Sequence, residues 1–99
     1  MTVLEVILSR EAARDIENIS DYTLARWGQG QARNYVATPR KDIESLSGFS
    51  LRYPVHEKSR LGLRCMSSGH HRVFYQAGEE RVLIVRVLHE RMDVEGRMS

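Results

Sequence analysis

The sequence has few of the residues that define several large protein classes. It contains one cysteine, Cys65, so no internal disulfide can form. No apolar run approaches the roughly 20 residues that a helix needs to span a bilayer. The N-terminus also lacks a basic segment followed by an apolar stretch, which would mark a secretory signal. These features predict a cytoplasmic protein without a membrane segment.

A strong charge of either sign is also missing. Fifteen Lys and Arg side chains against 13 Asp and Glu give a formal net charge of +2. All the basic residues except Lys41 and Lys58 are Arg. Arg suits planar, bidentate contacts at interfaces, although a genomic bias toward Arg codons explains the excess equally well. Because the net charge is small, we expect no direct sequence-specific binding of nucleic acid.

The first half of the chain is typical of two helices joined by a glycine-containing turn. A β-type run over residues 3–8 ends at Ser9, which is a good N-cap for a helix beginning at Arg10. The sequence Gly28-Gln29-Gly30 ends this helix, and a second runs from about 31 to 46. Their predicted inner faces, at helical spacing, comprise Ala12, Ile16, Ile19, Thr23 and Trp27, then Ala32, Tyr35, Val36, Ile43 and Leu46. This pattern predicts an antiparallel helical hairpin.

Two features of these helices lead to separate expectations. Pro39 falls inside the second helix, where proline removes a hydrogen bond and clashes with the preceding turn. We therefore expect a kink or break there, with Thr38 and Pro39 as the alternative N-cap and first residue of a new segment. The acidic residues of the first helix lie mostly outside its apolar face, which favours a solvated surface over a catalytic group; they are Glu11, Asp15, Glu17 and Asp21.

The second half reads as a three-stranded antiparallel meander over residues 61–67, 70–76 and 81–89. Gly-containing turns separate the runs. The last run is apolar at nearly every position, which is typical of a central strand, and we expect Arg86 within it to face the more open side. Residues 93–99 form a polar tail that we expect to be loosely held.

These elements together predict one α+β domain over residues 1–99. Their order is strand, helix, helix, strand, strand, strand. The apolar stripes predict that the helical hairpin packs on one face of a mainly antiparallel four-stranded sheet.

The residue types typical of catalytic or metal sites do not form a recognisable set. The sequence shows no Ser/His/Asp arrangement, no Gly-rich phosphate loop and no paired-carboxylate motif. His70 and His71 are adjacent in a predicted strand, so their side chains should point to opposite faces. His89 and Cys65 could approach one another, but two ligands are too few for a structural zinc site. We expect no metal, no cofactor and no catalytic residue.

The order and spacing of several short segments resemble the ParE toxins of the RelE/ParE superfamily. Each segment is weak alone, but the resemblance covers nearly the whole chain; residues 37–60 match poorly. The N-terminal segments are Leu8-Ser9-Arg10-Glu11-Ala12-Ala13-Arg14-Asp15-Ile16, Asp21-Tyr22, Arg26-Trp27-Gly28 and Gln31-Ala32-Arg33. The C-terminal segments are Gly62-Leu63-Arg64, Gly69-His70-His71-Arg72-Val73-Phe74-Tyr75 and Ile84-Val85-Arg86-Val87-Leu88-His89-Glu90-Arg91-Met92-Asp93.

This resemblance implies the toxin of a bacterial type II toxin–antitoxin pair. The implied antitoxin is ParD-like, with a ribbon-helix-helix DNA-binding part and a tail that wraps the toxin. The implied target is DNA gyrase, whose cleaved-DNA state such toxins stabilise. A third possibility is a toxin-like fold that serves only as an interaction module for an antitoxin.

The superfamily also contains RelE-type toxins, which cut messenger RNA on the ribosome. That chemistry needs a general base, a general acid and cations around the phosphate. Leu63 and Cys65 stand where RelE-like chains carry lysines, and no Tyr follows Tyr75. Arg72 and Arg91 do match functional arginines of RelE-like chains, but two arginines without a base cannot complete the reaction. We therefore favour binding over catalysis, with RelE-type cleavage as the alternative.

Five residues are candidates for contacts with partners. Arg72, His89 and Arg91 cluster near the end of the meander and are assigned to the target. The alternatives are ion pairs of the arginines with Glu79, Glu80 or Glu90, and a locally hydrogen-bonded histidine. Trp27 and Tyr35 flank the helical turn, where they either close the core or line an antitoxin groove.

Overall fold

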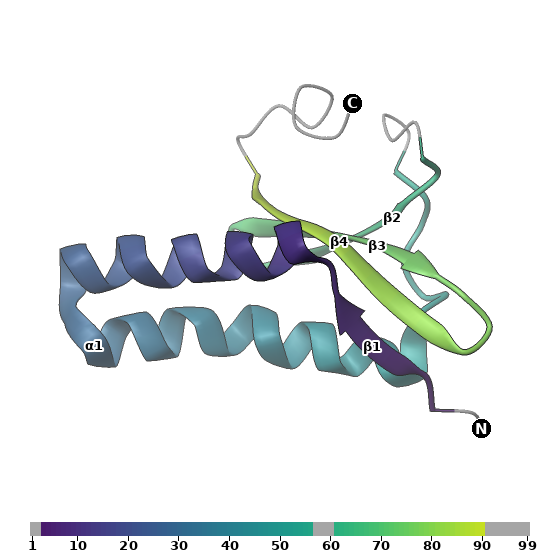
Figure 1. Cartoon of the computed structure of the whole chain (residues 1–99), viewed down its shortest axis with the longest axis horizontal. Coiled ribbons are helices and arrows are strands. Elements are labelled where there is room, and N and C mark those ends of the chain that lie inside the picture. Colours follow the sequence, from purple (N-terminus) through teal and green to yellow (C-terminus); the bar gives the residue numbers. More distant parts are fainter. Residues whose placement is uncertain (1–2, 57–60, 91–99) are drawn as a thin grey trace.

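The computed structural model describes residues 3–56 and 61–90, which form one helical hairpin and one sheet. The elements follow the order β1 (Glu5–Leu8), α1 (Arg10–Phe49), β2 (Arg64–Ser68), β3 (His71–Ala77) and β4 (Arg81–His89) (Figure 1). This arrangement confirms the predicted α+β fold. Residues 57–60 and the residues of the predicted tail, 93–99, lie outside the described part of the chain.

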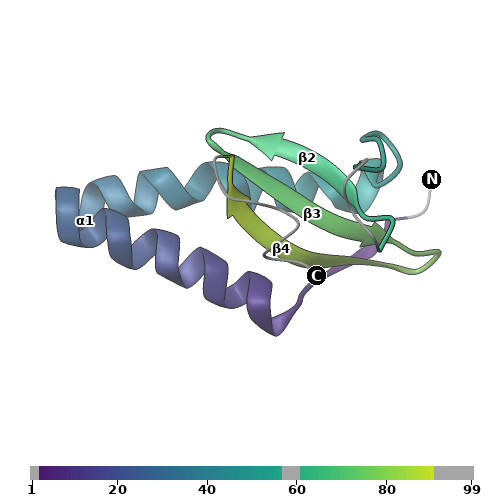
Figure 2. The same ribbon diagram turned by 90° about the horizontal axis from the view of Figure 1, so that it is seen from above.

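The element α1 consists of two antiparallel arms, residues 10–27 and 29–49, which meet at Gly28 (Figure 2). Ser9 caps the first arm, since its Oγ accepts a hydrogen bond from the amide of Ala12 at 3.0 Å. Gly28 has φ 87° and ψ 177°, a conformation that is essentially restricted to glycine. The predicted hairpin and its N-cap are therefore present, and Gly28 is where the chain reverses.

The expected break at Pro39 is wrong. The second arm continues through this residue to Phe49, and the only non-helical backbone angles within α1 are at Gly28. Pro39 is buried on the same stripe as Val36 and Ile43. Its ring contributes to the packed face of the arm, so burial offsets the lost backbone hydrogen bond.

The sheet is mixed, with strand order β1-β4-β3-β2. The meander β2-β3-β4 is antiparallel, as predicted, while β1 lies parallel to β4 along Arg81–Ile84. The register between β3 and β4 shifts so that Tyr75 lies opposite Ile84 but Phe74 lies opposite Arg86. This is a β-bulge, which bends a strand and re-aims its side chains.

The main core lies between both arms of α1 and one face of the sheet. The helices contribute Ala12, Ile16, Val36, Ile43 and Leu46, and the strands contribute Met66, Val73, Tyr75, Val82, Ile84 and Val87. A smaller cluster contains Leu63, Phe74 and Leu88, with Cys65 and Val85 packed against it. Phe74 alternates with Val73 and Tyr75 along β3, so this cluster belongs to the opposite face of the sheet.

Candidate functional site

A groove of about 480 Å³ opens between the outer half of the hairpin and the end of the sheet. The arms extend well beyond the strands, as Figure 1 shows, so this part of the hairpin has no sheet beneath it. Five of the lining residues are aliphatic, Tyr or Trp: Ile19, Tyr22, Trp27, Tyr35 and Val87. Thr23, Asp15, Asn18, Arg86, His71 and His89 complete the lining. Such a lining suits an amphipathic ligand.

The aromatic residues of the groove are held at the hairpin tip but are not part of the core. Trp27 is 60% exposed and Tyr22 is 57% exposed. Their rings meet edge to face with centroids 6.4 Å apart, a favoured aromatic geometry. The guanidinium of Arg26 lies 4.9 Å from the centre of the Tyr22 ring. Trp27 therefore does not close the core, and the groove alternative for this residue gains support.

Three histidines lie at the sheet end of the groove. The rings of His71 and His89 meet edge to face at 5.4 Å, and His70 and His89 stack at 6.5 Å. Tyr35 lies edge-on against His71 at 5.8 Å. His70 belongs to the turn before β3 and not to the strand itself. The ring of His89 therefore contacts both His70 and His71.

His71 is the most buried of these three histidines, with 7% of its surface exposed. Burial lowers its pKa below the ordinary value, and the neighbouring imidazoles of His89 and His70 lower it further, while Glu90 acts in the opposite direction. The carboxylate of Glu90 contacts His70, whose Nδ1 lies 3.2 Å from Oε1 of Glu90. The sheet end of the groove therefore favours neutral imidazole at His71.

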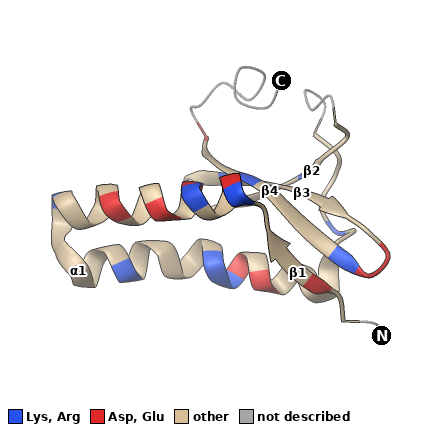
Figure 3. Cartoon of the chain, viewed as in Figure 1, with Lys and Arg blue, Asp and Glu red and all other residues tan. Residues whose placement is uncertain are grey.

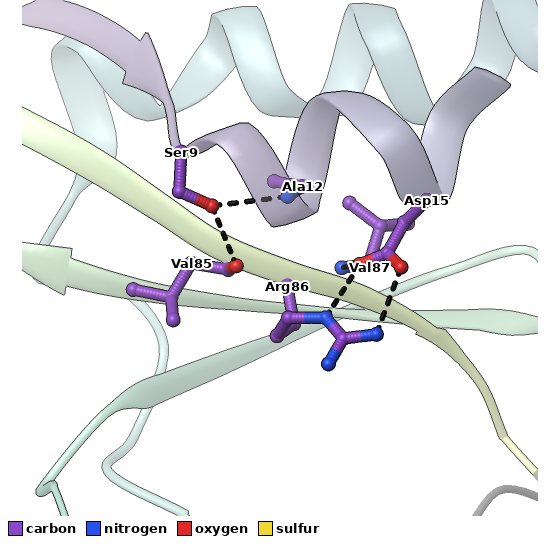
Figure 4. A network of polar contacts seen from close by, with 6 residues as sticks. All are labelled: Ser9, Ala12, Asp15, Val85, Arg86 and Val87. Carbon is purple, nitrogen blue, oxygen red and sulfur yellow. Dashed lines mark hydrogen bonds and ion pairs between the residues drawn. The ribbon is translucent and has the colours of Figure 1, made fainter. Parts of the chain in front are cut away.

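A partly buried ion pair forms the wall of the groove beside β4 (Figure 4). Arg86 donates two hydrogen bonds to Asp15, from Nε at 2.8 Å and from a terminal nitrogen at 2.9 Å. The side chain of Asp15 is 12% exposed and that of Arg86 is 20% exposed. These hydrogen bonds raise the pKa of Arg86 above its ordinary value. The expectation of a solvated Asp15 is therefore wrong, and Arg86 is turned toward the first arm.

Ser9 and Asp15 form hydrogen bonds to the backbone of β4 beyond its short pairing with β1. The backbone amide of Ser9 donates to the carbonyl of Ile84 at 2.8 Å, and the Ser9 hydroxyl donates to that of Val85 at 2.7 Å. Asp15 then accepts from the amide of Val87 at 2.9 Å. The start of α1 thus satisfies polar groups that an uncovered strand edge would expose.

The structure brings together some of the predicted contact residues and separates others. Trp27, Tyr35 and His89 line one groove, although the sequence assigned the first two to the antitoxin and the third to the target. Arg72 lies opposite Leu88 in the β3–β4 pairing, on the sheet face away from the helices. Arg91 falls outside the described residues. Of the three predicted target residues, Arg72 and His89 therefore lie on different faces of the sheet, and the assignment of all three to the target stays a prediction.

The ion pairs considered for Arg72 are also not observed. Within residues 3–56 and 61–90, no carboxylate forms a salt bridge with this arginine. Its charge instead acts on Cys65, where burial raises the thiol pKa and Arg72 partly opposes that change. Leu63 and Cys65 belong to the small apolar cluster on this face. The positions where RelE-like chains carry lysines therefore hold packed, uncharged side chains.

Asp15, Tyr22 and His71 are functional candidates that the sequence assignments did not include. Tyr22 lies one helical turn before Arg26, a spacing that signals a shared face. His71 shares a sheet face with Val73 and Tyr75, so strand alternation places it toward the helices. Nothing in the local sequence signals the pairing of Asp15 with Arg86, because 71 residues separate them.

Three further features of the described residues concern surface charge, membrane spanning and metal binding. Figure 3 shows Lys and Arg interspersed with Asp and Glu along both arms of α1. In the described part of the chain, no helix has the length and apolar character required to cross a bilayer. The same residues contain no group of three or more His, Cys, Asp or Glu side chains placed to hold a metal ion.

The fold is that of a small α+β protein, with a helical hairpin packed on a mixed four-stranded sheet. Its fold matches a chain in a structure described as the chromosomal ParDE TA system from P. aeruginosa, with a TM-score of 0.78. The match covers 88% of this chain and 96% of the other at 16% sequence identity. At that identity the likeness concerns the fold alone.

Sequence comparison shows the family. The family described as ParE toxin of type II toxin-antitoxin system, parDE, matches residues 6–94. Toxin ParE1 of Caulobacter vibrioides is 37% identical over 92 residues, covering 93% of this chain and 95% of that protein. Toxin ParE of Escherichia coli is 38% identical over 97 residues, covering 94% and 91%. Toxin ParE1 of Mycobacterium tuberculosis is 37% identical over 90 residues, covering 90% and 92%. The chain belongs to the ParE toxin family of type II toxin–antitoxin systems.

Proposed function

We propose that this toxin arrests growth by binding DNA gyrase in the cytoplasm and stabilising its cleaved-DNA complex, without a reaction or cofactor of its own. Membership of the ParE family is the observation that carries this proposal. The packed, uncharged Leu63 and Cys65 support binding over RelE-type cleavage, since they supply neither a general base nor a cation. A binding mechanism requires the toxin to prefer the cleaved state to the resealed state, because only differential affinity shifts an equilibrium.

The proposed antitoxin is ParD-like, as the description of the P. aeruginosa structure suggests. We assign its binding to the groove, where the exposed rings of Trp27 and Tyr22 and the half-buried ring of Tyr35 lie next to apolar residues of the first arm. An amphipathic segment of the antitoxin tail fits this lining, with its apolar side against the aromatic rings. If that tail is disordered before binding, its ordering costs several kcal/mol, which the apolar contact must exceed.

The position of His89 suggests how the antitoxin neutralises the toxin. His89 is a proposed target contact, and it lies in the groove with Trp27 and Tyr35. An antitoxin segment bound there covers His89, so target and antitoxin compete for the same surface. Arg72 and Arg91 remain proposed target contacts on the basis of the family resemblance, and Arg can pair with carboxylate or phosphate oxygens.

Purified gyrase provides the test. We expect the toxin to inhibit supercoiling and to increase cleaved-DNA complexes, and we expect addition of the antitoxin to reverse both effects. Translating ribosomes serve as the comparison, where messenger RNA should remain intact. A folded toxin that leaves supercoiling and cleavage unchanged would exclude gyrase as the target. Codon-phased cleavage of messenger RNA that disappears in Arg72→Ala would instead establish the RelE-type activity.

A further inference from the structure

The three histidines at the sheet end of the groove have no role in the function proposed above beyond the single contact of His89. They are His70, His71 and His89, which come from the β2–β3 turn, the start of β3 and the end of β4. Their ring contacts of 5.4 and 6.5 Å place three titratable groups side by side. Two of them, His71 and His89, line the same groove as Trp27.

The surroundings of His71 disfavour its protonation already in the free toxin. On the α1 side it faces the ring of Tyr35, and the Asp15 side chain farther along the groove is hydrogen-bonded to Arg86. On the strand side it faces His89, while His70 and Glu90 lie at the rim and contact each other. Glu90 is therefore the one nearby carboxylate among the described residues that favours the charged form.

We propose that occupancy of the groove is linked to protons, so that an apolar segment of the antitoxin binds when His71 is neutral and is released as His71 becomes protonated. The proposal rests on the assignment of the antitoxin to this groove. An apolar occupant removes water from the imidazole and so disfavours its charged form. By linkage, protonation of His71 must then disfavour the occupant.

Linkage also sets the direction and size of the expected effect. Below the His71 pKa of the free toxin, each unit of decrease in pH raises Kd by up to tenfold if one proton is released on binding. Above that pKa, Kd should not depend on this group. A carboxylate of the partner docked against the histidines would give the opposite sign, since it binds imidazolium better than imidazole.

Trp27 makes the measurement direct, because it is the only tryptophan in the sequence and it lines the groove. Its fluorescence should report binding of the purified ParD-like antitoxin to the full-length toxin between pH 5.5 and 8.0. We expect Kd to rise on acidification only once pH falls below the His71 pKa of the free toxin, which is lower than the ordinary imidazole value. We also expect proton release on binding at the acidic end of this range, measured by calorimetry in two buffers of different ionisation enthalpy.

Two variants separate this effect from a general loss of structure at low pH. His71→Gln should bind with a Kd that varies much less with pH. His56→Gln is the matched control, because His56 contacts Phe74 of the small cluster on the opposite sheet face, and it should retain the wild-type pH profile. Circular dichroism at each pH must show that the toxin remains folded.

The possible outcomes distinguish the two proposals. If Trp27→Ala binds the antitoxin as tightly as the wild type, the groove is not the antitoxin site and both proposals are overturned. If Trp27→Ala weakens binding but Kd is independent of pH, the proton linkage alone is overturned. A Kd that falls on acidification, or an equal pH dependence in His71→Gln, also overturns it.

Discussion

Arg86 and Asp15 join the last strand to the first helix through two parallel hydrogen bonds, although 71 residues separate them in sequence. The β-bulge lies beside the Arg86–Asp15 pair, because the register between β3 and β4 shifts between Phe74, which faces Arg86, and Tyr75. Asp15 also accepts the amide hydrogen of Val87, so one carboxylate satisfies both a side chain and the open edge of β4. The pair therefore fixes how the groove wall meets the hairpin.

Removing the charge of Asp15 should destabilise the toxin substantially. Asp15→Asn leaves a largely buried guanidinium with a weaker acceptor, which costs about 2–4 kcal/mol in the free energy of unfolding. Glu5→Gln is the matched control: Glu5 meets Arg81 at 3.9 Å with both side chains about two-thirds exposed. Such a surface pair contributes under about 1 kcal/mol. Urea denaturation at pH 7 measures both, and equal losses would contradict the structural role of Asp15.

Two glycines close together in the hairpin turn should respond in opposite ways to alanine. Gly28 has φ 87° and ψ 177°, which costs a side chain about 1–3 kcal/mol, so Gly28→Ala should lower stability. Gly30 lies within the helical stretch, has no positive φ and faces open space where a β-carbon would stand. Gly30→Ala should therefore raise stability by up to about 1 kcal/mol. A gain in thermal stability for both variants would show that Gly28 does not set the turn.

The outline of the fold could be predicted because its signals are local. Ser9 signals a helix start, the Gly28–Gly30 segment signals a reversal, and apolar spacing identifies the core faces of both arms. The predicted break at Pro39 was wrong because tertiary packing outweighed the low preference of proline for helix interiors. Burial at that position depends on the strands that follow, which a local pattern does not contain.

The site was less predictable because it depends on contacts distant in sequence. Trp27 and Tyr35 could be identified as aromatic residues beside the turn, but their common groove with His89 requires the hairpin to extend past the sheet. Asp15 looked solvated because its partner lies on the last strand. Arg72 and His89 were grouped because both were expected at the end of the meander, whereas strand alternation places them on different faces of the sheet.

Acidification should destabilise the free toxin through His71. Its pKa is lowered in the folded state by burial and by the neighbouring histidines. Below the unfolded value of about 6.5, the unfolded chain therefore binds more protons, and the free energy of unfolding falls as pH decreases. The loss should be complete once pH passes below the folded-state pKa. Urea midpoints at pH 7.5, 6.5 and 5.5 measure this, and His71→Gln should flatten the decline if the assignment is right.

Trp27 should act mainly on antitoxin binding and Arg91 mainly on toxicity, while His89 lies where the two partners are proposed to compete. Trp27→Ala removes the exposed aromatic anchor of the groove, and truncation of such a tryptophan typically costs about 2 kcal/mol or more, which raises Kd for the antitoxin about 30-fold. Arg91→Gln should reduce gyrase cleavage complexes and growth arrest while leaving Kd for the antitoxin largely unchanged. Arg40→Gln, on the exposed side of the second arm, is the matched control and should alter neither quantity. Antitoxin titrations and gyrase cleavage assays on the same preparations compare these variants directly. If Arg91→Gln weakens both interactions equally while remaining folded, this arginine belongs to a surface shared by target and antitoxin, and the proposed separation is wrong.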